Sequence, residues 1–196
     1  LQNIDAAISH LLDLINNLFD MSKIESSKMD LYIDTFDVAP MIQDVVTTIM
    51  PLCEKKSNIL KVHCDSALGT MSADLTKVRQ NLLNLLSNAN KFSKKSTITL
   101  TVMRETIEGK DFLLFRITDQ GIGMTEEQVQ KIFQAFVQIE GFSPRKYGGS
   151  GLSLAVTKQF CQIMGGDITV KSQFGKGSTF AMRLPALANR VKNVSH

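Results

Sequence analysis

The stretch that decides the fold is Phe112-Leu113-Leu114-Phe115-Arg116-Ile117-Thr118-Asp119-Gln120-Gly121-Ile122-Gly123. Its first residues are mainly apolar or β-branched and predict a buried β-strand. This strand ends at a carboxylate, Asp119, which is followed by a Gly-x-Gly turn. Asp119 can accept a hydrogen bond from an exocyclic amine, and Gly121 and Gly123 leave room for a planar base beside the main chain. Such turns also end strands for structural reasons alone, so the interpretation depends on the rest of the chain.

Length and composition restrict the class of protein. The 196 residues are 43% hydrophobic, which is enough for one core with a helical appendage. A formal net charge of +3 does not indicate a nucleic-acid partner. No uncharged apolar run is long enough to span a bilayer, and the first residues do not resemble a secretory signal. Cys53, Cys64 and Cys161 match no Cys-x-x-Cys spacing, which favours reduced thiols and a cytoplasmic location.

A long amphipathic helix is predicted at the start of the chain. Between Ile4 and about Ile24, apolar residues recur every three or four positions. One helix cannot bury so broad a face alone, so we expect a partner helix rather than the chain's own core, and a homodimer through residues 1–24. A polar run follows this helix. The chain therefore divides into a helical segment, a globular domain and a flexible tail: residues 1–28, 29–185 and 186–196.

A second helix is predicted between Leu75 and Phe92. Beside its apolar stripe lies a polar stripe of residues three, four and seven apart: Asn81, Asn84, Asn88 and Lys91. Asparagine is a poor residue for a helix interior, and a merely solvated face would more often carry Glu, Lys or Gln. Amide oxygens on the wall of a cleft could instead bind Mg²⁺, and Lys91 could contact a phosphate.

The remaining segments complete the domain. Two strands joined around Gly109 form a hairpin that delivers Asp119, and Thr125 with Gln128 forms a capping box. A polar stretch, residues 137–149, predicts a mobile loop. It leads through Gly148-Gly149-Ser150-Gly151 into a helix, which is a typical anion site, although a plain loop–helix junction has the same composition.

Together these segments resemble the catalytic domain of histidine kinases in the GHKL (Bergerat-fold) superfamily of ATP-binding proteins. The matching segments are the N, G1, F and G2 boxes: residues 84–92, 119–124, 133–136 and 149–154. Each box alone is a weak signal, but four in order at fitting separations are specific. The resemblance covers roughly residues 30–185. It implies an α/β (α+β) two-layer sandwich with a mixed sheet and helices on one face, preceded by a long helix that resembles the second helix of the family's dimerisation hairpin.

The resemblance also implies ligands and residue roles. ATP or ADP and Mg²⁺ would bind, with Asp119 on the adenine amine and Gly121 and Gly123 shaping the pocket. Asn88 would ligate Mg²⁺ with Asn84. Asn84 and Lys91 are the implied catalytic residues, and Lys91 would contact phosphate. The other implied nucleotide-binding residues come from the F box, from the loop at residues 137–149, which corresponds to the family's lid, and from the G2 box: Phe133, Arg145, Lys146, Gly149, Gly151 and Leu152.

The implied reaction is transfer of the γ-phosphoryl group to a histidine of a dimerisation hairpin in two-component signalling, with a response-regulator receiver domain as a further partner. The family's phosphoacceptor motif is missing, and His10 lacks its neighbours, so we expect a fragment of a sensor kinase. ATPases of the same superfamily carry a glutamate base where this chain has Asn84, which cannot take a proton from water. The alternative is a catalytically silent module for nucleotide binding and dimerisation.

Overall fold

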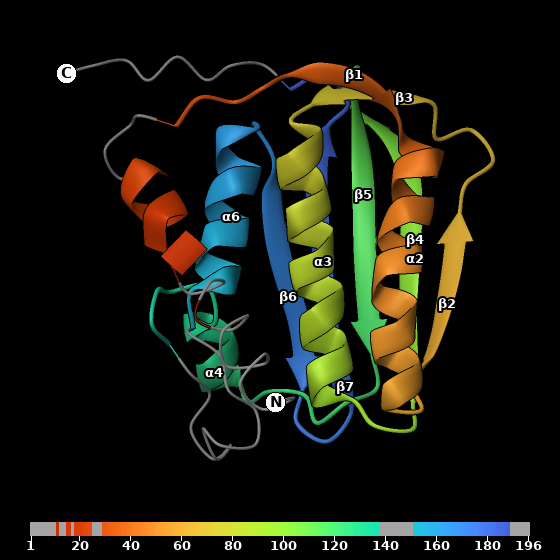
Figure 1. Cartoon of the computed structure of the whole chain (residues 1–196), viewed down its shortest axis with the longest axis vertical. Helices are drawn as coiled ribbons and strands as arrows, with labels where there is room; N and C mark the ends of the chain where they lie inside the picture. The colour runs from red at the N-terminus through yellow and green to blue at the C-terminus, as the bar shows by residue number, and fades with distance from the viewer. Residues whose placement is uncertain (1–10, 12–14, 17, 25–28, 138–150, 189–196) are drawn as a thin grey trace.

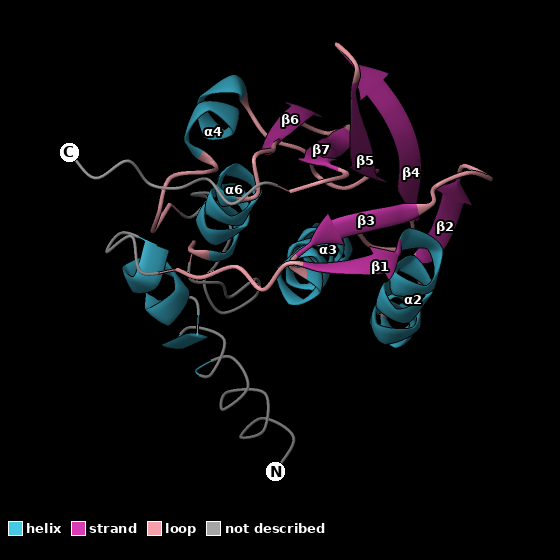
Figure 2. Cartoon of the chain, turned by 90° about the horizontal axis from the view of Figure 1, so that it is seen from above, coloured by secondary structure: helices cyan, strands magenta, loops and turns pink. Residues whose placement is uncertain are grey.

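The computed structural model describes residues 11, 15–16, 18–24, 29–137 and 151–188 of the chain. One layer is a five-stranded mixed sheet in the order β2-β4-β5-β7-β6, and the other layer is formed by α2, α3 and α6 on one face of the sheet (Figures 1 and 2). Only the β2–β4 pair of this sheet is parallel. A separate ribbon of β1 and β3 crosses one end of the helices (Figure 1). The predicted two-layer sandwich is therefore confirmed.

The helix predicted over residues 75–92 and the hairpin predicted around Gly109 are both present. In chain order the elements are β1 (Asp34–Asp37), α2 (Val38–Lys55), β2 (Ile59–Cys64), β3 (Thr70–Ala73), α3 (Leu75–Phe92), β4 (Thr97–Ile107), β5 (Lys110–Asp119), α4 (Glu126–Lys131), α6 (Ser153–Ile163), β6 (Asp167–Gln173) and β7 (Gly177–Pro185).

The helix α3 begins and ends where the sequence predicts. Asp74 caps its N-terminus, since the Asp74 carboxylate accepts hydrogen bonds from the main-chain N–H groups of Lys77 and Tyr32, both at 3.1 Å. One face of α3 is fully buried against the sheet, and full burial of each leucine there contributes about 2 kcal/mol. This face consists of Val78, Leu82, Leu85, Leu86 and Ala89. The helix therefore has a fixed position from which its polar side chains reach the site.

The β4–β5 hairpin is longer than predicted and turns at Gly109, as expected. Alternate β5 residues, among them Leu113, Phe115 and Ile117, are fully buried toward the helices. The same alternation brings Asp119, at the end of the strand, to the helix-covered face. The predicted capping box is also confirmed, because the side chains and main-chain N–H groups of Thr125 and Gln128 bond reciprocally.

The described part of the N-terminal helix corrects one prediction. Its C-terminal end docks on the chain's own core: Met21 and Ile24 pack against core residues, and an Asp20 carboxylate oxygen lies 3.2 Å from Lys77 Nζ on α3. The expectation that this helix does not dock on its own core is therefore wrong at this end. Further toward the N-terminus, the described apolar side chains are 43–63% exposed: Leu11, Ile15, Leu18 and Phe19.

The boundary of the C-terminal tail also lies later than predicted. Ser72 of β3 donates its N–H to the Ala186 carbonyl at 2.7 Å and accepts a hydrogen bond from the Ala188 N–H at 2.8 Å. Both alanines are buried. These residues therefore belong to the globular domain, and residues 189–196 lie outside the described part of the chain. Within the described residues, no helix is both long and apolar enough to cross a membrane.

Candidate functional site

The carboxylate of Asp119 is the centre of the predicted site. It is 6% exposed, and its Oδ1 accepts a hydrogen bond from the Gly121 N–H at 2.8 Å. The main-chain N–H of Ser178, opposite Asp119 on β7, also donates to this carboxylate. Burial raises the pKa of Asp119 above its ordinary value, and the two N–H donors partly oppose this shift. An ionised carboxylate has further lone pairs, so Asp119 can still accept a hydrogen bond from a ligand.

The glycine turn after Asp119 lies in close contact with two other parts of the main chain. A Cβ atom on Gly121 would lie 2.4 Å from the carbonyl oxygen of Phe92, at the end of α3. Gly123 has a φ of +64°, and its Cβ would lie 2.0 Å from the carbonyl oxygen of Gln173, at the end of β6. These glycines are therefore required by packing within the protein, whatever room they also leave for a base.

The polar stripe of α3 is narrower than predicted. Asn81 is fully buried, with its amide nitrogen 3.6 Å from Cys161 Sγ, and does not belong to a cleft wall. Asn84, Asn88 and Lys91 are half-buried. The Asn84 amide nitrogen donates to Thr157 Oγ1 of α6 at 3.5 Å, which turns the amide so that its oxygen can serve as a ligand. The stripe thus offers two amide groups and one lysine.

A buried network that sequence analysis missed holds the end of α3. Asn58 donates to Asn90 Oδ1 at 2.7 Å, and Lys56 Nζ donates to the Lys91 carbonyl at 2.8 Å. A lysine at a helix C-terminus satisfies carbonyls that have no partner within the helix. Burial, and secondly the positive charge of Lys56, lower the pKa of Lys91. This network fixes the last turn of α3 beside the Gly121 turn.

The segments around the second glycine cluster are described only in part. Phe133 packs edge-on against Phe180, with ring centroids 6.3 Å apart. The Phe136 N–H donates to the Gly151 carbonyl at 3.1 Å, and Gly151 has a φ of +68°. Leu152 is buried and directly precedes α6, so only its main chain could face a ligand. Arg145, Lys146 and Gly149 lie outside the described residues.

The end of α3 and the turn after β5 therefore meet, which brings Asp119 into one region with the Asn88 and Lys91 end of the helix. The contact includes a hydrogen bond of 3.4 Å from the Ile122 N–H to the Phe92 carbonyl. A buried acceptor for a base at one end, with amide oxygens and a lysine along α3, fits a nucleotide with a bound divalent cation.

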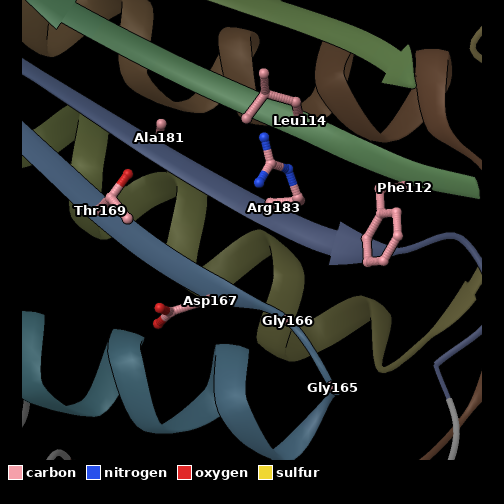
Figure 3. Close-up of a pocket in the computed structure, with 8 residues that line it drawn as sticks. All are labelled: Phe112, Leu114, Gly165, Gly166, Asp167, Thr169, Ala181 and Arg183. Carbon is pink, nitrogen blue, oxygen red and sulfur yellow. The ribbon is translucent and has the colours of Figure 1, made fainter. Parts of the chain in front are cut away.

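A separate cavity of about 350 Å³ lies away from this region (Figure 3). It is lined by residues of β5, β6 and β7 and by the turn after α6: Phe112, Leu114, Gly165, Gly166, Asp167, Thr169, Ala181 and Arg183. In each strand these positions alternate with core residues such as Leu113, Ile168 and Met182, so the cavity faces away from the helices. It contains none of the predicted site residues.

The fold and site define a class of ATP-binding domain, and comparison with known proteins identifies the family. Residues 73–188 match the family described as "Histidine kinase-, DNA gyrase B-, and HSP90-like ATPase". This match covers more than half of the chain. The chain therefore belongs to this family.

Similar proteins are named histidine kinases. The chain is 36% identical over 179 residues to the hybrid signal transduction histidine kinase B of Dictyostelium discoideum, covering 90% of this chain and 9% of that protein. It is 37% identical over 191 residues to the sensor protein GacS of Pseudomonas syringae pv. syringae, covering 94% of this chain and 21% of that protein. The chain thus spans less than a quarter of the length of these relatives.

Solved structures agree with the fold. A crystal structure of full-length ShkA in complex with AMPPNP has a TM-score of 0.78 at 29% identity, covering 90% of this chain and 36% of that one. The Acinetobacter baumannii histidine kinase AdeS has a TM-score of 0.76 at 19% identity, covering 94% of this chain and 83% of that one. These comparisons match the fold expected for a histidine-kinase catalytic domain.

Proposed function

We propose that this chain binds ATP with Mg²⁺ and supplies the catalytic domain of a histidine kinase. The observation that carries the proposal is the buried Asp119 carboxylate at the end of β5, in contact through its turn with the asparagine-bearing helix α3. The solved relative crystallised with AMPPNP supports an adenine nucleotide as ligand.

The proposed roles follow the chemistry of each group. Asp119 accepts the adenine amine, Asn88 and Asn84 provide amide oxygens for Mg²⁺, and Lys91 contacts phosphate. The metal would neutralise charge on the phosphates. The chain's own task is to hold and align the nucleotide, because phosphoryl transfer depends mainly on positioning and charge stabilisation. Phe133, Gly151, Leu152 and the lid residues Arg145, Lys146 and Gly149 remain proposed nucleotide contacts.

The proposed acceptor is a histidine on a dimerisation hairpin, and a receiver domain is the proposed next partner. Two observations support transfer over hydrolysis. Asn84, at the position where the superfamily's ATPases have a glutamate base, holds a hydrogen bond to Thr157 and cannot take a proton from water. The similar proteins are also named kinases. We further propose a cytoplasmic location.

Calorimetric titration with ADP, with and without Mg²⁺, tests this function. We expect Mg²⁺ to strengthen binding by about 10-fold, equivalent to ~1.4 kcal/mol. In Asn88→Ala this enhancement should fall, because one of the two proposed metal ligands is removed, while binding without metal should be unchanged. Ser87→Ala, an exposed position on the same helix, is the matched control.

The outcomes separate the alternatives. Absence of nucleotide binding by the unmodified chain would contradict the proposed function. Binding without transfer of labelled phosphate from ATP to a separately supplied histidine hairpin would favour the catalytically silent module.

Deleting residues 1–19 tests the proposed homodimer. The deletion removes the exposed apolar side chains but keeps Asp20, Met21 and Ile24, which contact the globular domain. We expect light scattering to show a monomer and calorimetry to show unchanged ADP affinity. A dimer that persists after the deletion would mean that another surface mediates association.

A further inference from the structure

We propose that Ser172 is a positioning residue of the nucleotide pocket: its hydroxyl ties the Gly121–Gly123 turn to the β6–β7 hairpin and makes the hydroxyl of Ser178 a pure acceptor opposite Asp119. The inference rests on the proposed function, since it assigns a role within the same site. Neither serine belongs to the residues that the sequence predicts for the site.

The Ser172 hydroxyl makes three hydrogen bonds. It accepts from the Met124 N–H at 2.8 Å, donates to the Gly177 carbonyl at 2.9 Å and lies 2.9 Å from Ser178 Oγ. Met124 directly follows the Gly121–Gly123 turn, and Gly177 begins β7. One side chain therefore links the turn after β5 to the end of β6 and the start of β7.

The chemistry of a hydroxyl fixes the direction of the Ser172–Ser178 hydrogen bond. A hydroxyl has one proton and two lone pairs. Because a carbonyl can only accept, the Ser172 proton points to Gly177, and both Ser172 lone pairs remain as acceptors. The Met124 N–H takes one of them. Ser178 must therefore be the donor to the other.

This direction gives Ser178 a defined polarity. With its proton on Ser172, the Ser178 oxygen can only accept further hydrogen bonds. Ser178 is 8% exposed and is paired with Asp119 across the β5–β7 ladder, so the two side chains project from the same face of the sheet. The corner at Asp119 and Ser178 thus contains a carboxylate and an acceptor-only hydroxyl.

Such a corner discriminates between bases. It favours a base whose edge carries an amine, as adenine does, and disfavours hypoxanthine, which has a carbonyl oxygen in the same place. Without Ser172, the Ser178 hydroxyl could rotate and donate its proton to that oxygen. Ser172 therefore contributes to base selectivity without touching the base.

The same hydroxyl also holds the turn in place. A second bond, from the Gly175 N–H to the Ile122 carbonyl at 2.7 Å, joins the hairpin tip to the turn. Loss of Ser172 leaves the Met124 N–H, which belongs to a residue only 5% exposed, without its partner. The turn that carries Gly121 then loses one of the two hydrogen bonds described here between it and the hairpin, and we expect weaker nucleotide binding.

The first test uses the ligand-free protein. In Ser172→Ala, hydrogen exchange of the Met124 amide, followed by NMR, should accelerate at least 10-fold, while exchange of the Ile117 amide in the middle of β5 should not change. Unchanged Met124 protection would overturn the inference whether or not the chain binds nucleotide.

The second test measures affinities for ADP and IDP by calorimetry. Ser172→Ala should bind ADP about 5-fold more weakly, and its preference for ADP over IDP should narrow at least 3-fold. Thr169→Ala, on the same strand but on the opposite face, is the matched control. This variant should keep both the ADP affinity and the preference for ADP over IDP of the unmodified chain. If the alanine variant does not fold, the isosteric pair Ser172→Thr and Ser172→Val isolates the hydroxyl. Ser172→Thr should keep the ADP affinity and base preference of the unmodified chain, and Ser172→Val should show the losses stated above.

The results distinguish a failure of the role proposed for Ser172 from a failure of the proposed nucleotide site. Equal losses for ADP and IDP, or a Val variant that matches Thr, would overturn the role of Ser172 while leaving the nucleotide site intact. An unmodified chain that binds neither nucleotide would instead overturn the proposed function and, with it, selectivity by Ser172.

Discussion

Replacing Asp119 with alanine is expected to weaken ADP binding by about 10- to 150-fold. A hydrogen bond to a charged group contributes about 1.5–3 kcal/mol, and each 1.4 kcal/mol is a factor of ten in affinity. The alanine variant also leaves two main-chain donors without their acceptor, the N–H groups of Gly121 and Ser178. Asp119→Asn removes the negative charge but keeps an oxygen that can accept from these donors. Comparing the two variants therefore separates the effect of the charge from the effect of a disturbed Gly121 turn. Calorimetry measures the affinity, and circular dichroism checks the fold.

Asp111→Ala is the matched control for this experiment. Asp111 lies near the opposite end of β5, where its exposed carboxylate pairs with Arg104 at 3.2 Å. Removing such a pair has little effect on stability, and none is expected on ADP affinity. An Asp119→Ala protein that binds ADP as tightly as the control would show that the base binds elsewhere.

Replacing Gly123 with alanine is expected to lower the melting temperature by about 4–20 °C. A positive φ costs a residue with a side chain about 1–2 kcal/mol, and overpacking typically costs a further 1–3 kcal/mol. Here the added methyl group would lie 2.0 Å from the main-chain carbonyl oxygen of Gln173, which cannot move without disturbing the end of β6. For a domain of this size, 1 kcal/mol shifts the melting temperature by about 2–4 °C.

Gly175→Ala provides a close comparison. Gly175 has a φ of +79°, but nothing lies within 4 Å of its Cβ position. Alanine there incurs the conformational cost without the clash, so thermal melts should show a fall of only about 2–8 °C. Equal falls for the two variants would mean that the turn after β5 does not pack tightly on the end of β6.

Elements with a local signal could be predicted from the sequence. The cap at Asp74, the bounds of α3, the capping box at Thr125 and the turn at Gly109 all depend on residues within a few positions of one another. The two-layer fold could be expected because four sequence boxes in order resemble a known family, and the five-stranded sheet covered by helices confirms it. The alternation of Leu31, Ile33 and Phe36 predicts a short strand within residues 29–38. The strand observed there, β1, begins only at Asp34, because its extent depends on pairing with the distant strand β3.

Features that depend on tertiary contact were harder to predict. Helical spacing would place Leu52 among the core residues of α2, but it is 44% exposed and Cys53 is buried instead, because the sheet determines which side of the helix is covered. Asn81 shares the spacing of Asn84 and Asn88 yet faces the core, since α6 covers that part of α3. Helical spacing alone cannot separate these positions.

The amino-acid sequence contains a signal for the role proposed for Ser172, which the sequence analysis missed. Ser172 and Ser178 lie on either side of the glycine-rich turn Gly175-Lys176-Gly177, and a hairpin pairs such residues directly, as the structure shows. Register across the turn would therefore have placed two hydroxyl groups opposite each other. The hydrogen bond from the Met124 N–H to the Ser172 hydroxyl could not be predicted, because it depends on how the turn after β5 meets the hairpin.

The hydrogen bond between Phe136 and Gly151 has a consequence for how this family can vary. It brings together two points of the chain separated by fourteen residues, and a Cβ atom on Gly151 would lie only 2.6 Å from the carbonyl oxygen of Val137. The entropy of closing an intervening segment grows slowly with its length, by about 0.6 kcal/mol for each doubling. Insertions between these anchors should therefore cost the domain little stability. Evolution can therefore change the length and composition of the segment between Phe136 and Gly151 almost independently of the sheet and helices that carry it.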